Sequence, residues 1–411
     1  DSLTDADFNV ALGSSALASD TLGSRSVALG TSALQFQNFT SATNNYNTAV
    51  GFQAGRQVTT GVENTLIGGL AGDALTGGGF SGTTRQDGAD YNVALGYLAL
   101  SADTLGSRSV AIGYNTLGTQ NFTGATNTYN IAVGHGAGAS VSTGTLNTFV
   151  GGLAGDSTDD GSSNVAVGYS ALSGNCGDGN TAIGRSALIN ATSSDNTAIG
   201  HDAGVSITTG TQNAFVGKQA GNIVSTGSGN TVIGYNADCG GGAAVGRIAV
   251  GISVICSSNQ RMTVGYGGNT ASLELNGSDT SWAASSDERL KENVVASTAG
   301  LSFINDLRPV TYNWKKAKDI PSDLPQYIEG SDNPCLGKTY GTQLHGFIAQ
   351  EVKSVIDNHP EVKDGQSVWQ TDETTVQTLA PAALVPMLVK AIQEQQTLIE
   401  ALTARIETLE G

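Results

Sequence analysis

A serine and a lysine five residues apart, Ser286 and Lys291, are the pair of side chains in this sequence best suited to chemistry. They belong to the segment 285–291, Ser-Ser-Asp-Glu-Arg-Leu-Lys, which places a second cation, Arg289, between them. A serine hydroxyl becomes a nucleophile when a base removes its proton. A lysine amine is such a base once burial or a neighbouring cation lowers its pKa from about 10.4. By itself, the spacing favours a solvated, charged helix start capped by Ser286 or Asp287.

Two further sequence motifs follow in order, and they favour a catalytic role for Ser286 and Lys291 over a simple helix start. Residues 307–314 read Leu-Arg-Pro-Val-Thr-Tyr-Asn-Trp, and residues 345–352 read His-Gly-Phe-Ile-Ala-Gln-Glu-Val. Together with Ser-Asp-x-Arg-Leu-Lys at 286–291, these blocks resemble the signature of the intramolecular chaperone domain of phage tailspikes, tail fibres and endosialidases, the S74 peptidase family. The resemblance implies a module that directs folding and trimerisation and then cuts the chain beside its serine.

The same resemblance implies roles for the first block. Lys291 would take the hydroxyl proton of Ser286, and the alkoxide would attack the adjacent carbonyl to give an ester that water hydrolyses. Arg289 can keep Lys291 neutral, and Asp287 can orient the turn. The doubled serine leaves two candidate bonds, one on either side of Ser286. Within the third block, His345, Gln350 and Glu351 either support cleavage or hold the chaperone fold.

Composition excludes several other functions. The net charge of −17 argues against nucleic-acid binding, because phosphate is repelled by most of such a surface. No stretch approaches the roughly 20 apolar residues of a membrane span. The cysteines at 176, 239, 256 and 335 lack metal-binding spacing, which predicts free thiols and neither metal nor cofactor.

A repeat fills the first two-thirds of the chain. The pattern Asn-x-Ala-hydrophobic-Gly-x-x-Ala-(Gly/Leu) begins at Asn9, Ser26, Asn47, Asn64, Asn92, Ser109, Asn130, Asn147, Asn164, Asn180, Asn196, Asn213 and Asn230. Most steps are 16 or 17 residues, and insertions produce steps of 21 and 28. This period predicts a β-solenoid in which each coil has two short strands and two turns. Glycine at the fifth position and asparagine at the first fit turn positions with positive φ.

Consecutive apolar positions within each unit predict that both faces of the strand are buried. One face would fill the coil, and the other, lined by small alanines, would pack on another copy. The alternative is a broader monomeric β-helix. The units resemble the head repeats of trimeric autotransporter adhesins and similar repeats in phage tail fibres, which implies a trimeric parallel β-roll.

The insertions at 35–46, 73–90 and 118–129 contain aromatic residues among polar ones, namely Phe36, Phe39, Phe80 and Phe122, with Tyr91 and Tyr129 alongside. They predict either a carbohydrate-contacting surface or packing on a neighbouring chain. His135 and His201 are expected in surface turns. No recurring pair of carboxylates of the kind that a glycosidase needs is evident.

The C-terminal tail has heptad spacing. Val385, Ile392, Ile399 and Ile406 occupy a positions, and Leu388, Gln395, Leu402 and Leu409 occupy d positions. Ile at a with Leu at d favours a dimer by itself, whereas the family resemblance implies a trimer. The alternative is a helix that packs only on its own domain.

The sequence therefore predicts a mainly β repeat shaft, followed by a smaller α+β chaperone domain that ends in a coiled-coil helix. The expected domains are the solenoid at 1–251, an irregular β junction at 252–284, the chaperone at 285–384 and the coiled coil at 385–411. We expect a homotrimeric phage tail fibre in the virion that binds a host-surface polysaccharide or other receptor, and other virion tail proteins. A bacterial trimeric surface adhesin and a polysaccharide-degrading tailspike are the alternatives.

Overall fold

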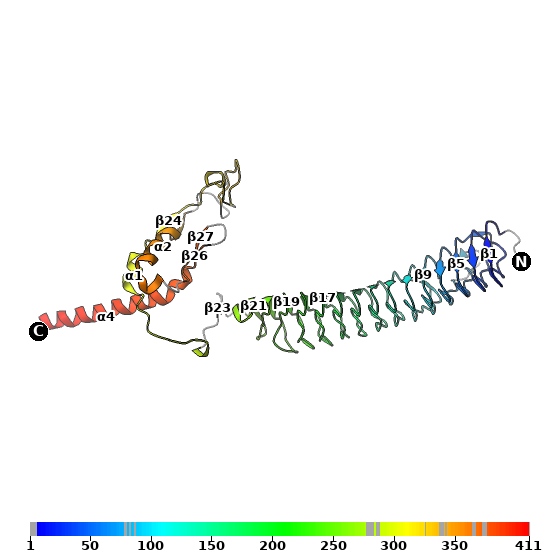
Figure 1. The fold of residues 1–411 in the computed structure, drawn as a ribbon, viewed down its shortest axis with the longest axis horizontal. Helices are drawn as coiled ribbons and strands as arrows, with labels where there is room; N and C mark the ends of the chain where they lie inside the picture. Colours follow the sequence, from blue (N-terminus) through cyan, green and yellow to red (C-terminus); the bar gives the residue numbers. More distant parts are fainter. Residues whose placement is uncertain are drawn as a thin grey trace. The chain divides into compact units, whose positions relative to one another are not determined.

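The chain forms two compact units, Asp1–Ser286 and Asp287–Gly411 (Figure 1). The computed structural model describes residues 6–410, apart from 78–79, 82–83, 86–87, 277–282, 285–287, 325, 337–340, 342, 364–366 and 372–375. Each unit is described below by itself.

The first unit is a β-solenoid whose coils stack through one parallel ladder (Figure 1). The parallel strands, in chain order, are β1 (Val10–Leu12), β3 (Val27–Leu29), β5 (Thr48–Val50), β6 (Thr65–Ile67), β9 (Val93–Leu95), β11 (Val110–Ile112), β13 (Ile131–Val133), β14 (Thr148–Val150), β15 (Val165–Val167), β16 (Thr181–Ile183), β17 (Thr197–Ile199), β18 (Ala214–Val216), β19 (Thr231–Ile233), β20 (Ile248–Ile252) and β21 (Arg261–Tyr266). Two antiparallel strands, β22 (Asn269–Glu274) and β23 (Ala283–Ala284), complete the sheet. The predicted solenoid is confirmed, and its parallel ladder continues past Gly251 to Tyr266.

Most coils contribute one strand rather than the predicted two. Among the described residues, second strands occur in the pairs β2 (Gly23–Ser24) with β4 (Thr43–Asn44) and β10 (Gly106–Ser107) with β12 (Thr126–Asn127), and a hairpin joins β7 (Phe80–Ser81) to β8 (Thr84–Arg85). Elsewhere the return path consists of turns, because several residues of each coil have positive φ, as Leu188 does at 50°. These turns are held by backbone hydrogen bonds between coils, such as the 2.9 Å bond from the Thr192 N–H to the Thr208 carbonyl.

The core of the solenoid is lined by the middle residue of each strand. Ala182 and Ala198 are fully buried, whereas Ile183 and Ile199 beside them are 38% and 40% exposed. The prediction that alanines line the outward face was therefore wrong. The interior of such a narrow coil has room for a methyl group opposite a leucine, and the branched side chains point outward.

Side-chain volumes in this core are matched between neighbouring coils. Where Phe149 replaces the usual alanine, glycines at 138 and 155 replace the usual leucine. A Cβ built on Gly155 would lie 2.6 Å from the Phe149 ring, and one on Gly138 would lie 2.9 Å from it. Phe215 has the same relationship to Gly204 and Gly221. The substitutions therefore keep the packed volume nearly constant along the shaft.

The first-position asparagines form a buried ladder, which corrects their predicted role in turns. The Oδ1 of Asn147 accepts a 2.9 Å hydrogen bond from the Asn164 N–H, and its Nδ2 donates to the Gly161 carbonyl at 2.8 Å. Positive φ falls instead on the preceding residue, such as Leu146 at 61°. Asparagine is needed here because it supplies both an acceptor and a donor to buried backbone groups.

The fifth-position glycines have positive φ, as predicted. Gly184 has φ of 131°, and a Cβ on it would lie 2.4 Å from the Gly200 carbonyl oxygen. Both the backbone conformation and the close approach of the next coil therefore require glycine.

The predicted aromatic surface of the insertions is largely absent. Phe39 and Phe122 are buried in the chain's own shaft, and Phe36 is half-buried beneath the Arg56 guanidinium. Tyr91 and Tyr129 are exposed, but they flank Arg108, whose guanidinium carbon lies 4.9 and 5.9 Å from their ring centres. The side chain of Phe80 is outside the described part of the chain.

The second unit is a small α+β domain that ends in a long helix. Its elements are η1 (Glu288–Leu290), α1 (Leu301–Asp306), β24 (Val310–Tyr312), η2 (Ala317–Asp319), β25 (Leu344–Gly346), α2 (Ala349–Asn358), α3 (Pro360–Lys363), β26 (Trp369–Thr371), β27 (Gln377–Leu379), η3 (Pro381–Leu384) and α4 (Val385–Glu410). Its core contains Phe303 of α1, Val352 and Ile356 of α2, and Leu384. Val352 and Ile356 are one helical turn apart, so α2 buries one face.

Helix α4 packs on its own domain through a face other than the heptad positions. Ala391 is buried, Met387 contacts the core, and Glu394 accepts a 2.7 Å hydrogen bond from the Leu301 N–H at the start of α1. The apolar heptad residues, by contrast, are 42–79% exposed: Val385, Leu388, Ile392, Ile399, Leu402, Ile406 and Leu409. Among the described residues, no helix is long and apolar enough to cross a membrane.

Candidate functional site

The second and third sequence blocks meet as neighbouring strands. Helix α1 ends at Asp306, three residues before Pro309, as expected because proline disfavours helix in the residue before it. Strand β24 then pairs antiparallel with β25, which aligns Thr311 with His345. Blocks more than 30 residues apart in the chain therefore build one structural element.

An ion pair between Arg308 and Glu351 also holds these two sequence blocks together. The Arg308 Nε donates a 2.9 Å hydrogen bond to one Glu351 carboxylate oxygen, and an Arg308 Nη donates to the other. This bidentate contact lowers the pKa of Glu351 and raises that of Arg308. Glu351 lies in the first turn of α2, where negative charge is also favoured by the helix dipole. The contact gives Glu351 a structural role in holding α2 against the start of β24.

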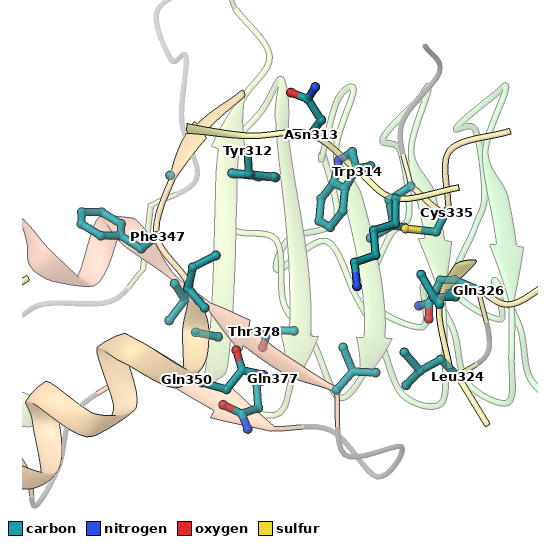
Figure 2. A pocket seen from close by; sticks show the side chains of 18 of the residues that line it. Tyr312, Asn313, Trp314, Leu324, Gln326, Cys335, Phe347, Gln350, Gln377 and Thr378 are labelled. Carbon is teal, nitrogen blue, oxygen red and sulfur yellow. The ribbon is translucent and has the colours of Figure 1, made fainter. Parts of the chain in front are cut away.

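A mostly apolar hollow of about 1040 Å³ lies beside these strands (Figure 2). Tyr312 and Trp314 line one side, with ring centres 5.3 Å apart in an edge-to-face arrangement. Phe347 and residues of β27 line another part. Several polar side chains also line the wall, among them Lys315, His345, Gln350 and Gln377. Such a surface can bury an extended apolar chain segment while a few polar groups meet its backbone.

The structure brings together only some of the predicted site residues. His345 and Gln350 both line the hollow, whereas Glu351 is occupied by Arg308. Lys291 follows η1 on the exposed surface, and its N–H donates to the Glu288 carbonyl at 3.0 Å. Arg289 is exposed on η1. Ser286 and Asp287 lie outside the described residues, so the dyad geometry is a prediction.

A histidine that sequence reasoning missed is central to this domain. His359 is mostly buried, and its Nε2 and Nδ1 lie 2.8 Å from carboxylate oxygens of Asp306 and Glu361. Its ring also packs edge-to-face on Phe303 with ring centres 5.3 Å apart. The hydrogen bond with Asp306, followed by that with Glu361, raises the pKa of His359. In the sequence, only Glu361, two residues away, indicates a carboxylate partner for His359, because Asp306 is 53 residues distant.

No cluster of three or more histidine, cysteine, aspartate or glutamate side chains suited to a metal occurs in the described ranges.

Comparison with known proteins agrees with the position of this domain. The family model for the chaperone of endosialidase, peptidase S74, matches residues 286–360, beginning at Ser286 itself. Neither the curated proteins nor the solved structures contain a match to the chain. Residues 286–360 are thus a chaperone-of-endosialidase domain, and they follow a β-solenoid shaft.

Proposed function

We propose that this chain is a homotrimeric phage tail fibre, whose C-terminal domain directs assembly of the shaft and then releases itself by cutting at Ser286. The observation that carries the proposal is the S74 match, which begins where a solenoid with fifteen parallel strands ends. A chaperone of this family placed directly after a repetitive shaft is suited to controlling how identical shafts associate.

The repeats explain why the shaft needs such control. Strands β16 and β17 both read Thr-Ala-Ile, and β3 and β9 both read Val-Ala-Leu. Copies displaced by one coil would therefore lose few contacts, so the wrong alignment competes with the correct one. A C-terminal module that trimerises first sets the alignment of the three chains before their shafts associate.

The exposed heptads of α4 provide the trimerisation surface in this proposal. Its apolar heptad residues stay 42–79% exposed, although α4 is anchored to α1 through Glu394. Ile at a and Leu at d favour a dimer in isolated coiled coils. We assign a trimer because the seam is short and is joined to the family's domain and to a long shaft.

Cleavage would follow assembly. Lys291 accepts the Ser286 hydroxyl proton, and the alkoxide attacks the carbonyl carbon of a peptide bond beside Ser286. The C–N bond of that peptide breaks as Lys291 returns the proton to the departing amine nitrogen, and water hydrolyses the resulting ester. The chaperone then leaves, and the shaft cannot retrace its folding path, so its persistence depends on the rate of unfolding. This is a single turnover on the chain's own backbone.

Mass spectrometry of the purified protein tests the cleavage. The wild type is expected to yield a fragment that begins at or next to Ser286 and extends to the C-terminus, and Ser286→Ala and Lys291→Ala are expected to remain whole. Thr298→Ala serves as a control in the same segment. An intact wild type would rule out self-cleavage, and a cleaved Ser286→Ala would show that another nucleophile acts.

The released shaft would act in the virion, attached to other tail proteins and contacting a polysaccharide or another receptor on the host. Binding of fluorescent, cleaved shaft to susceptible bacteria, with resistant bacteria of the same strain as the control, tests this part separately. Equal binding to both would remove the receptor role and leave the assembly role in place.

A further inference from the structure

The outward face of the ladder is a continuous strip of aliphatic and threonine side chains. On either side of each buried middle residue, the strand presents a threonine or aliphatic side chain to the surface. The larger exposed members are Leu95, Ile131, Val150, Ile183, Ile199, Val216 and Ile233, each about two-fifths exposed. Because the strands pair residue for residue, these side chains form continuous rows along the shaft. A strip of this length in water marks a contact surface.

Two files of side chains border this strip. We call the residue before each first-position asparagine the leading edge, and the residue after each fifth-position glycine the trailing edge. The leading edge includes Tyr91, Arg108, Tyr129, Leu146, Ser163, Gly179, Asp195, Gln212 and Gly229. The trailing edge includes Tyr97, Tyr114, His135, Gly152, Tyr169, Arg185, His201, Lys218 and Tyr235.

Neighbouring members of each file are in contact at several levels. On the trailing edge, Tyr114 stacks on Tyr97 and on His135, with ring centres 6.0 and 5.0 Å apart, and Arg185 lies 3.0 Å from the His201 ring nitrogen. On the leading edge, Arg108 lies between Tyr91 and Tyr129. These contacts fix the positions of the side chains on both borders at those levels.

The two edges are complementary at several levels. Glycine on one edge faces a large side chain on the other at Gly179 with Arg185, at Gly229 with Tyr235, and at Leu146 with Gly152. The acidic Asp195 lies on the leading edge, whereas the trailing edge at that level carries Arg185, His201 and Lys218, of which His201 also contacts Asp202 of its own chain at 2.8 Å. The edges of one shaft lie on opposite sides of its apolar strip, so they cannot meet within one chain.

Cyclic symmetry brings such edges together. When identical parallel copies surround one axis, the leading edge of each copy lies beside the trailing edge of the next. We propose that the ladder face is the contact between identical copies, in register, with the aliphatic rows toward the axis and Asp195 of one copy opposite His201 of the next. This inference rests on the proposed homotrimer and specifies the surface and alignment that build it.

Disulfide trapping tests the alignment in the full-length protein. Cys335→Ser removes the one half-exposed native thiol, since Cys176, Cys239 and Cys256 are buried. In that background, the pair Asp195→Cys and His201→Cys is expected to give covalent trimers on a non-reducing gel after mild oxidation with a small disulfide. Within one chain these positions are separated by roughly 15–20 Å of strand, which is beyond the reach of a disulfide.

An out-of-register pair is the matched control. Asp195→Cys with Tyr235→Cys keeps the same two edges but shifts the trailing residue by two coils, and it is expected to remain monomeric on the gel. Covalent trimers from this pair alone would overturn the proposed register. If neither pair crosslinks while sedimentation shows a trimer, the ladder face is not the interface. A protein that sediments as a monomer would instead remove the proposed trimer itself.

Charge placed on the strip gives an independent readout. Ile199→Glu is expected to separate the shafts, abolishing the Asp195–His201 crosslink, because a carboxylate would face the axis without a partner. Ile223→Glu is the control, since Ile223 is 51% exposed but lies outside the strands of the ladder. Undiminished crosslinking in the Ile199 variant would show that the strip faces solvent.

Discussion

The Nε2 of His359 lies 2.8 Å from a carboxylate oxygen of Asp306, across 53 residues of chain. The other ring nitrogen contacts Glu361, so the site favours the doubly protonated imidazolium, which donates at both nitrogens. The contacts of His359 with the two carboxylates join the end of α1 to the junction between α2 and α3, next to Phe303 in the core. The histidine therefore stabilises the chaperone domain in proportion to its charge.

The stability of the chaperone domain is predicted to fall as the pH rises through the raised pKa of His359. Protonation is favoured in the folded state, so the stabilisation is complete below the unfolded value of about 6.5 and is lost above the folded value. Tryptophan fluorescence chiefly follows this domain, because it contains two of the three tryptophans, Trp314 and Trp369. We expect its thermal midpoint to be lower at pH 9 than at pH 6.

His359→Gln should flatten this pH dependence, and Asp306→Asn should reduce it while Glu361 still contacts the ring. The reference variant is His345→Gln, which alters an exposed histidine of the same domain. An unchanged slope in His359→Gln would assign the pH dependence to other groups.

The asparagine ladder predicts a local effect in the shaft. Asn213 accepts a 3.0 Å hydrogen bond from the Asn230 N–H and donates one of 2.9 Å to the Gly227 carbonyl. Asn213→Ala leaves both buried backbone groups unpaired, at a cost of about 1–3 kcal/mol each. Hydrogen exchange of the coils around 213–230 should accelerate. Asn222→Ala, which removes only an exposed 3.5 Å contact, should leave exchange unchanged.

The matched volumes predict that two harmful substitutions will rescue each other. Gly155→Leu drives a side chain into the Phe149 ring, and Phe149→Ala leaves a cavity that costs about 3–5 kcal/mol. The double variant recreates the pair Ala166 and Leu172 of the next coil, where Leu172 is accommodated at a φ of 55°. We expect the thermal midpoint of the double variant to exceed that of both single variants. Additive losses would show that the two positions are not coupled.

The solenoid could be predicted because its signal is repeated many times. A glycine recurs at the same position of each unit, and this recurrence correctly indicated the positive φ at Gly184. The direction of each side chain could not be assigned, because in a three-residue strand either the alanine or its neighbours can face inward. The space inside the coil decides which side chain faces inward. That space depends on the facing core residues as well, as the pair Phe149 and Gly155 shows.

The candidate site was predictable only where residues act through a local motif. The blocks at 307–314 and 345–352 marked segments of the domain, but they predicted neither the pairing of β24 with β25 nor the ion pair from Arg308 to Glu351, which both depend on the folded domain. The contact between His359 and Asp306 likewise joins residues that no short pattern relates. Long-range polar contacts of this kind leave no periodic trace in a single sequence.

The ion pair between Arg308 and Glu351 predicts which residues of the third block are structural. If Glu351 acts only by binding Arg308, then Glu351→Gln and Arg308→Gln should lower the thermal midpoint of the chaperone domain to a similar, modest extent, since both side chains are exposed. The double variant should lose little more than either single one. Self-cleavage, followed as loss of intact chain during expression and purification, should continue in all three but stop in Lys291→Ala. Arrest of cleavage in Glu351→Gln with normal cleavage in Arg308→Gln would instead place the Glu351 carboxylate in the cleavage step.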